Sequence, residues 1–168
     1  MGHLSEEKLK SLQDFLGHEL EISKFLHSTP TREFAEEIMT NGFVFENHLM
    51  HTTDQISGYD LVELNYFLMI RKNYGHFTVV IEISDKLIVE FTKRLRSYNY
   101  HFSEALTKNP PWFNEDENPV YTLPEQFVRG YFDQLTMEKI YNPKFNPYYR
   151  SPLFEENMKR LISSNHNP

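Results

Sequence analysis

Residues 77–83, FTVVIEI, constrain the fold more than any other stretch of the chain. They are β-branched and almost wholly apolar, a composition typical of a strand that is covered on both faces. We therefore expect this strand to lie in the middle of a sheet.

Apolar residues at helical spacing predict helices in addition to this strand. Ser5 can cap a first helix within residues 1–21. A second helix is expected to open at Thr29-Pro30, with the proline at its first position, and to end at Gly42. Its expected buried side consists of Phe34, Ala35, Ile38 and Met39. Further helices are expected at residues 60–72, 86–96 and 153–162.

Short apolar and β-branched runs between turn residues predict additional strands. These runs cover residues 22–27, 43–45, 49–52, 120–123, 126–132 and 137–141. Residues 109–118 are expected to form a loop, and Thr53-Asp54 to cap a brief helical turn. Strands and helices that alternate within 168 residues predict a single α+β domain.

The charge balance and the residue types present exclude several classes of protein. The chain has 24 acidic and 17 basic residues, a net charge of −7, and its densest basic run, KRLR at 93–96, is interpreted as a solvated helix face. No duplex nucleic-acid binding is expected. Because there is no cysteine, disulfides, thiolate zinc sites and a cysteine nucleophile are excluded. The polar start and the lack of a long apolar run predict no signal peptide, no membrane span and a cytoplasmic location, with secretion as an effector left open.

Known metal and nucleotide motifs are missing from the sequence. Glu46, His48 and His51 lie close together in ENHLMH, but on an extended segment the two histidines point to opposite faces. We therefore predict a surface turn there and no metal site. The chain contains no GxSxG, GxGxxG or Walker A motif, so neither a nucleophile elbow nor a glycine-rich phosphate loop is supported.

Two short segments resemble the ADP-ribosyltransferase fold that mono-ADP-ribosyltransferases and poly(ADP-ribose) polymerases share. The first is FLHST at 25–29, followed by a helix and by NGF at 41–43; the second is LPEQFV at 123–128. The resemblance covers about residues 22–141. It implies an ADP-ribosyltransferase-like core with a mixed, mostly antiparallel split sheet flanked by helices. Residues 1–21 would precede this core as an N-terminal helix, and residues 142–168 would follow it as an irregular tail with a short helix.

The resemblance implies NAD as substrate and assigns roles to particular residues. His27 matches the histidine that holds a ribose, and Ser28 and Thr29 would help to bind NAD. Tyr59 and Tyr66 both lie where the family places the tyrosine that stacks on nicotinamide, and Tyr59 is slightly favoured. The third position, an acid in the transferases, falls on either Glu125 or Gln126; these two also complete the set of candidate site residues. Arg71 and Arg129 could contact the phosphates, although ion pairs with acids are the stronger expectation.

These roles follow from the chemistry of ADP-ribose transfer. Breaking the bond to nicotinamide passes through an oxocarbenium-like state, which a carboxylate stabilises. A histidine nitrogen that donates to a ribose hydroxyl would position the sugar, and a tyrosine would stack on the nicotinamide ring. The acceptor, a protein or a nucleic acid, is left open. The alternatives are an inactive binding module on the same fold, which a glutamine in place of the acid favours, and an RNA 2′-phosphotransferase, which the acidic balance disfavours.

Overall fold

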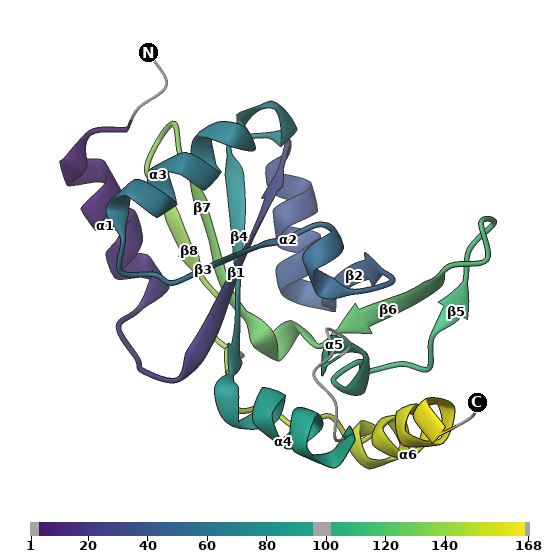
Figure 1. The fold of residues 1–168 in the computed structure, drawn as a ribbon. Helices are drawn as coiled ribbons and strands as arrows, with labels where there is room; N and C mark the ends of the chain where they lie inside the picture. Colours follow the sequence, from purple (N-terminus) through teal and green to yellow (C-terminus); the bar gives the residue numbers. More distant parts are fainter. Residues whose placement is uncertain (1–3, 96–101, 167–168) are drawn as a thin grey trace.

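A five-stranded antiparallel sheet forms the centre of the molecule in the computed structural model, which describes residues 4–95 and 102–166. The strand order is β3-β1-β4-β7-β8 (Figure 1). The strands are β1 (Ile22–Thr29), β3 (Asp54–Ile56), β4 (Phe77–Ser84), β7 (Val128–Asp133) and β8 (Lys139–Tyr141). The predicted central strand is β4: it lies in the middle of the sheet, and all of its residues are buried.

A second, three-stranded sheet has the order β2-β6-β5. Its strands are β2 (Phe43–Glu46), β5 (Trp112–Phe113) and β6 (Pro119–Leu123). The sheet is therefore split, as expected, and within the described residues every strand pairing is antiparallel, so the parallel pair that a mixed sheet requires does not occur there. The segment 109–118 is not wholly a loop, because β5 pairs with the start of β6.

The helices of the described residues are α1 (Glu6–Leu16), α2 (Arg32–Asn41), α3 (Leu61–Ile70), α4 (Asp85–Leu95), α5 (Phe102–Ala105) and α6 (Phe154–His166). Helices α4, α5 and α6 pack on one another beyond the end of the larger sheet, whereas the other three cover its faces (Figure 1). Helices α1 and α3 pack on one face, where Val80 points into their hydrophobic cluster. Val79 and Ile81 point the opposite way into a larger cluster that includes Ala35 of α2. This alternation along β4 is the two-residue period of a strand that is buried on both sides.

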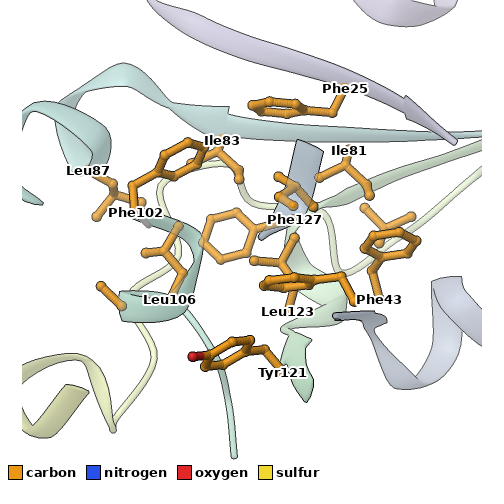
Figure 2. Packing of buried hydrophobic residues seen from close by; sticks show 14 of the residues in the cluster. Phe25, Phe43, Ile81, Ile83, Leu87, Phe102, Leu106, Tyr121, Leu123 and Phe127 are labelled. Atoms are coloured by element: carbon orange, nitrogen blue, oxygen red, sulfur yellow. The ribbon is translucent and has the colours of Figure 1, made fainter. Parts of the chain in front are cut away.

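The larger hydrophobic cluster joins the two sheets (Figure 2). Phe43 of β2 pairs with Leu123 of β6, and both contribute to the same core as Phe25 and Ile81 of the larger sheet. Phe127, fully buried, lies among them. Each such side chain contributes about 1.5–3 kcal/mol by leaving water, so the sheets are held together by this shared core.

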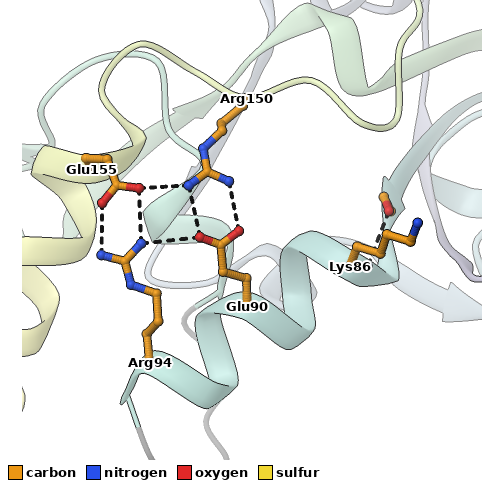
Figure 3. A network of polar contacts seen from close by, with 6 residues as sticks. Lys86, Glu90, Arg94, Arg150 and Glu155 are labelled. Atoms are coloured by element: carbon orange, nitrogen blue, oxygen red, sulfur yellow. Dashed lines mark hydrogen bonds and ion pairs between the residues drawn. The ribbon is translucent and has the colours of Figure 1, made fainter.

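The predicted C-terminal helix is confirmed and extends further than expected, as α6. Phe154 is buried against the core, and an ion-pair network links α6 to α4 and to the segment before α6 (Figure 3). Arg94 and Arg150 each contact both Glu90 and Glu155 at 2.7–3.3 Å. This network therefore holds the C-terminal segment against α4. Arg96, the end of the predicted basic run, lies outside the described residues.

Several predicted local structures are confirmed and others are wrong. Ser5 caps α1 by accepting a hydrogen bond from Lys8 N, and Gly42 ends α2 with φ 103°. Pro30 is not the first helical residue, because Thr31 caps α2 instead. Phe34 is not core: it is 57% exposed, since the fully buried position on α2 is its neighbour Ala35.

Between β2 and α3 the predicted order, a strand followed by a helical turn, is wrong, because the helical turn comes first and the strand second. Residues 49–52 are not a strand: the 3-10 helix η1 (Leu49–His51) occupies them. The Thr53 hydroxyl donates to the Leu49 carbonyl and closes this turn. Asp54 does not cap a helical turn, because β3 begins there and pairs with the free edge of β1. Similarly, the strand predicted from residue 126 begins later, after the 3-10 helix η3 (Glu125–Phe127).

Candidate functional site

A cavity of about 200 Å³ opens beside the second half of β1. Its walls come from β1, η1, the start of β3, and the region where α3 passes into the 3-10 helix η2 (Lys72–Tyr74). The lining residues are Leu26, His27, Ser28, Met50, His51, Thr52, Thr53, Asp54, Arg71 and Tyr74. Segments that are far apart in the sequence therefore surround the predicted ribose-holding histidine.

Strand pairing accounts for much of this arrangement. Leu26 of β1 lies opposite Asp54 of β3 in antiparallel register, which brings the start of β3 beside His27. The turn η1 returns the chain to this edge, and the Thr52 carbonyl then faces the His27 ring. The cavity is thus built at the end of a short edge strand.

The hydrogen bond of His27 fixes which of its nitrogens is free. Nδ1 lies 2.8 Å from the Thr52 carbonyl oxygen, which can only accept, so Nδ1 carries the proton. The ring edge packs against Phe43 at 4.9 Å between centroids. Burial lowers the pKa of His27, and this effect outweighs the opposing hydrogen bond to Thr52 and the charge of Asp54. At neutral pH the imidazole is therefore uncharged and Nε2 is an acceptor, which differs from the donating histidine expected from the sequence.

Asp54 and Arg71 form a bidentate ion pair in the cavity wall. Arg71 Nε and Nη2 each lie 2.8 Å from one oxygen of the Asp54 carboxylate. The hydrogen bonds to Asp54 raise the pKa of Arg71. The Arg71 side chain is 40% exposed, and its guanidinium carbon lies 6.0 Å from the centre of the Tyr74 ring. Because a guanidinium has five N–H donors, Arg71 keeps donors for a ligand while Asp54 orients it.

The two tyrosines predicted to stack on nicotinamide do not line this cavity. Tyr59 is 79% exposed and lies just before α3, and Tyr66 is 57% exposed on α3 itself. Tyr74 is the tyrosine in the cavity wall. Ser28 also lines the cavity, whereas Thr29 is buried at the end of β1 and does not.

The two candidates for the acidic position lie outside the cavity lining, in η3. The Glu125 carboxylate accepts a hydrogen bond from Lys108 Nζ at 2.8 Å. Burial raises the pKa of Glu125, but Lys108 and the backbone hydrogen bond outweigh it, so the pKa is below its ordinary value and the group is ionised at neutral pH. The backbone carbonyl of Gln126 accepts from Asn146 N at 2.7 Å and ties η3 to the C-terminal segment.

The ENHLMH segment does not converge as a metal site. Within residues 4–95 and 102–166 no group of three or more potential ligands is arranged to hold a metal ion. The Glu46 carboxylate instead accepts from the Asn118 amide, and His51 lines the cavity. Arg129, the second predicted phosphate contact, is held by Glu82 and by Glu19, away from the cavity lining.

Sequence reasoning missed Asp54, His51 and Tyr74 as members of this site. Asp54 and His51 lie where the secondary structure was predicted wrongly, so their approach to His27 was hidden. One signal in the sequence bears on Tyr74: it lies just beyond the helix predicted at residues 60–72, near the turn that leads into β4.

Comparisons with protein-family models, with curated proteins and with solved structures give no significant match. Of the described helices, none combines the length and the apolar character that crossing a membrane requires.

Proposed function

We propose that the chain is an ADP-ribosyltransferase-like protein that binds NAD in the His27 cavity and transfers ADP-ribose to an acceptor, releasing nicotinamide. The observation that carries the proposal is that one cavity wall contains His27, Arg71 and Tyr74. These three groups match a ribose hydroxyl, a phosphate and an aromatic ring. The split sheet, with β1 leading into α2, supports the proposal.

His27 is proposed to hold the ribose by accepting a hydrogen bond. Its Nδ1 is occupied by the Thr52 carbonyl, so Nε2 is the nitrogen available to a ligand hydroxyl. Arg71 is proposed to contact the phosphates with the donors that Asp54 leaves free. Tyr74 takes the stacking role in this proposal, in preference to Tyr59 and Tyr66, which face solvent outside the cavity.

A second candidate, NAD binding without transfer, is favoured by one observation. Glu125 is ion-paired with Lys108 and does not line the cavity. The carboxylate that does line it, Asp54, is neutralised by Arg71. If neither carboxylate reaches the ribose, the protein would bind NAD without breaking the glycosidic bond.

Two measurements test the proposal. Calorimetry measures NAD binding, and nicotinamide-labelled NAD reports release. His27→Ala and Tyr74→Ala are expected to weaken binding at least tenfold, whereas the exposed matched controls Tyr59→Ala and Tyr66→Ala are expected to leave it unchanged. Absence of NAD binding by the wild-type chain rejects both functions, and binding without release supports the second.

The acidic position is tested separately by comparing variants in the release assay. Loss of release in Glu125→Ala alone, or in Gln126→Ala alone, assigns that residue. If His27→Ala binds and releases like the wild-type chain, the assignment of the first position is wrong.

A further inference from the structure

A second cavity, of about 340 Å³, also borders η2 and shares no lining residue with the His27 cavity. It is formed where β4 begins and β7 ends, under the C-terminal part of α3 and the N-terminal segment. Its polar side chains are Lys72, His76 and Gln134, of which Gln134 donates to the Thr78 hydroxyl, and its apolar wall consists of Leu4, Met69 and Leu135. The proposed NAD site uses none of these residues.

His76 is held in place by a nearly buried carboxylate. Its Nδ1 lies 2.8 Å from Asp133 Oδ1, and the side chain of Asp133 is 6% exposed. The same oxygen accepts from Leu135 N at 2.8 Å. Burial raises the pKa of Asp133, but the hydrogen bond from His76 and those from Leu135 and Thr136 outweigh it, so the pKa lies below its ordinary value. An ionised Asp133 requires the proton on His76 Nδ1, which leaves Nε2 for a ligand.

Lys72 supplies an uncompensated positive charge at the cavity rim. It is exposed, and no ion pair or hydrogen bond from its ammonium group is present within the described part of the chain. Neighbouring Arg71, by contrast, is ion-paired with Asp54 in the wall of the His27 cavity. A cation without a counter-ion beside a fixed imidazole favours an anionic ligand group.

The remaining wall of the cavity favours an apolar ligand body. Leu135 is 71% exposed at the turn between β7 and β8, and Leu4 and Met69 are only partly buried. A ligand that covers these side chains would remove apolar surface from water. A free phosphate offers no such surface, so the apolar wall selects against it.

From this pairing of charge and apolar surface we propose that the cavity binds a small amphipathic carboxylate. Its carboxylate contacts Lys72 Nζ beside the His76 ring, and its hydrocarbon part covers Leu4, Met69 and Leu135. A medium-chain fatty acid has this chemistry and serves as the probe. The site is independent of the proposed NAD function.

The test is calorimetric titration of the full chain with octanoate. Saturable binding is expected, with affinity reduced at least tenfold in Lys72→Met and in Leu135→Ser, both of which alter exposed side chains. Lys93→Met, a comparably exposed lysine on α4, is the matched control and is expected to bind like the wild-type chain. Octan-1-ol, which keeps the tail and lacks the charge, is expected to bind at least tenfold more weakly.

A second readout locates the ligand. The ring signals of His76, assigned with His76→Gln, are expected to shift on addition of octanoate. No saturable binding up to the solubility limit of octanoate overturns the proposal. Equal affinity in Lys72→Met, or equal affinity for octan-1-ol, also overturns it, because the carboxylate would then not be recognised.

Discussion

Three charged side chains from adjacent strands of the larger sheet meet on one of its faces, and removing one of them is expected to be strongly destabilising. Glu82 of β4 is fully buried, with Lys24 Nζ 3.2 Å from Oε1 and Arg129 Nε 2.8 Å from Oε2. Lys24 also donates to the Leu16 carbonyl at 2.7 Å, and Arg129 reaches Glu19 at 2.9 Å. Glu82→Gln keeps the shape of the side chain but leaves two nearly buried cations facing a neutral amide.

The magnitude follows from the burial of these groups. Removing one partner of a buried ion pair costs about 3–5 kcal/mol, a large part of a total stability of about 5–15 kcal/mol. With a urea dependence of about 2 kcal/mol per M, the unfolding midpoint should fall by about 1.5–2.5 M. Circular dichroism during urea unfolding measures this shift.

Removing all three charges together should cost less than removing one. Burial raises the pKa of Glu82, and Arg129 and Lys24 only oppose this rise, so desolvation outweighs their attraction. The triple variant Lys24→Met, Glu82→Leu, Arg129→Met should therefore recover part of the loss. A deficit of about 1–3 kcal/mol is expected to persist, because the Leu16 carbonyl loses its donor.

A matched control comes from the exposed ion pairs. Glu90→Gln also removes a carboxylate that two arginines contact, but its side chain is 32% exposed, and a loss below about 1 kcal/mol is expected. The reasoning is refuted if Glu82→Gln lies within about 1 kcal/mol of the wild-type chain, or if the triple variant is less stable than Glu82→Gln.

Three further predictions concern individual residues. Hydrogen bonds from Arg94 and Arg150 lower the pKa of Glu155 to about 2, so its stabilising contribution is intact above about pH 4.3 and declines as the pH falls from there. The melting temperature of Glu155→Gln should equal that of the wild-type chain at high salt and lie below it at low salt. Burial lowers the pKa of His27, so the folded state binds fewer protons than the unfolded state and stability declines as the pH falls below about 6.5. In His27→Gln, the free energy of unfolding measured in urea should lack this part of its pH dependence. Gly75→Ala should cost more than about 1 kcal/mol in urea unfolding, because φ is 133° and the added Cβ would strike the Thr29 carbonyl.

The central strand and the helix ends could be predicted from the sequence because their signals are local. Residues 77–83 are β-branched and almost wholly apolar, and this pattern is typical of burial on both sides. Ser5 and Gly42 act through their own side chain or backbone geometry, which is also local. Phe34 shows the limit of such patterns, because its apolar character does not reveal that α2 turns it toward solvent.

The composition of the site could not be predicted because it depends on pairing over long distances. Asp54 reaches His27 only because β3 adds to the edge of β1. This pairing could not be predicted, because a three-residue strand with one apolar residue has no recognisable alternation. The choice of tyrosine rested on sequence position relative to the family pattern, whereas the place of Tyr74 follows from η2, a turn without side-chain caps. Glu125 lies in the expected segment, but its partner Lys108 comes from a distant stretch of the chain.

In the proposed transfer reaction a carboxylate must face the ribose, and Asp54 and Glu125 are the two candidates. Asp54 lies in the cavity wall but is neutralised by Arg71, and Glu125 lies outside it and is neutralised by Lys108. A phosphate that binds Arg71 would compete with Asp54 for the same donors and so free the carboxylate beside His27. Asp54→Asn is therefore expected to lower nicotinamide release more than Glu125→Ala does, with NAD binding retained in both. The opposite order would mean that η3 moves toward the ligand, and equal release in both variants and the wild-type chain would mean that neither carboxylate takes part.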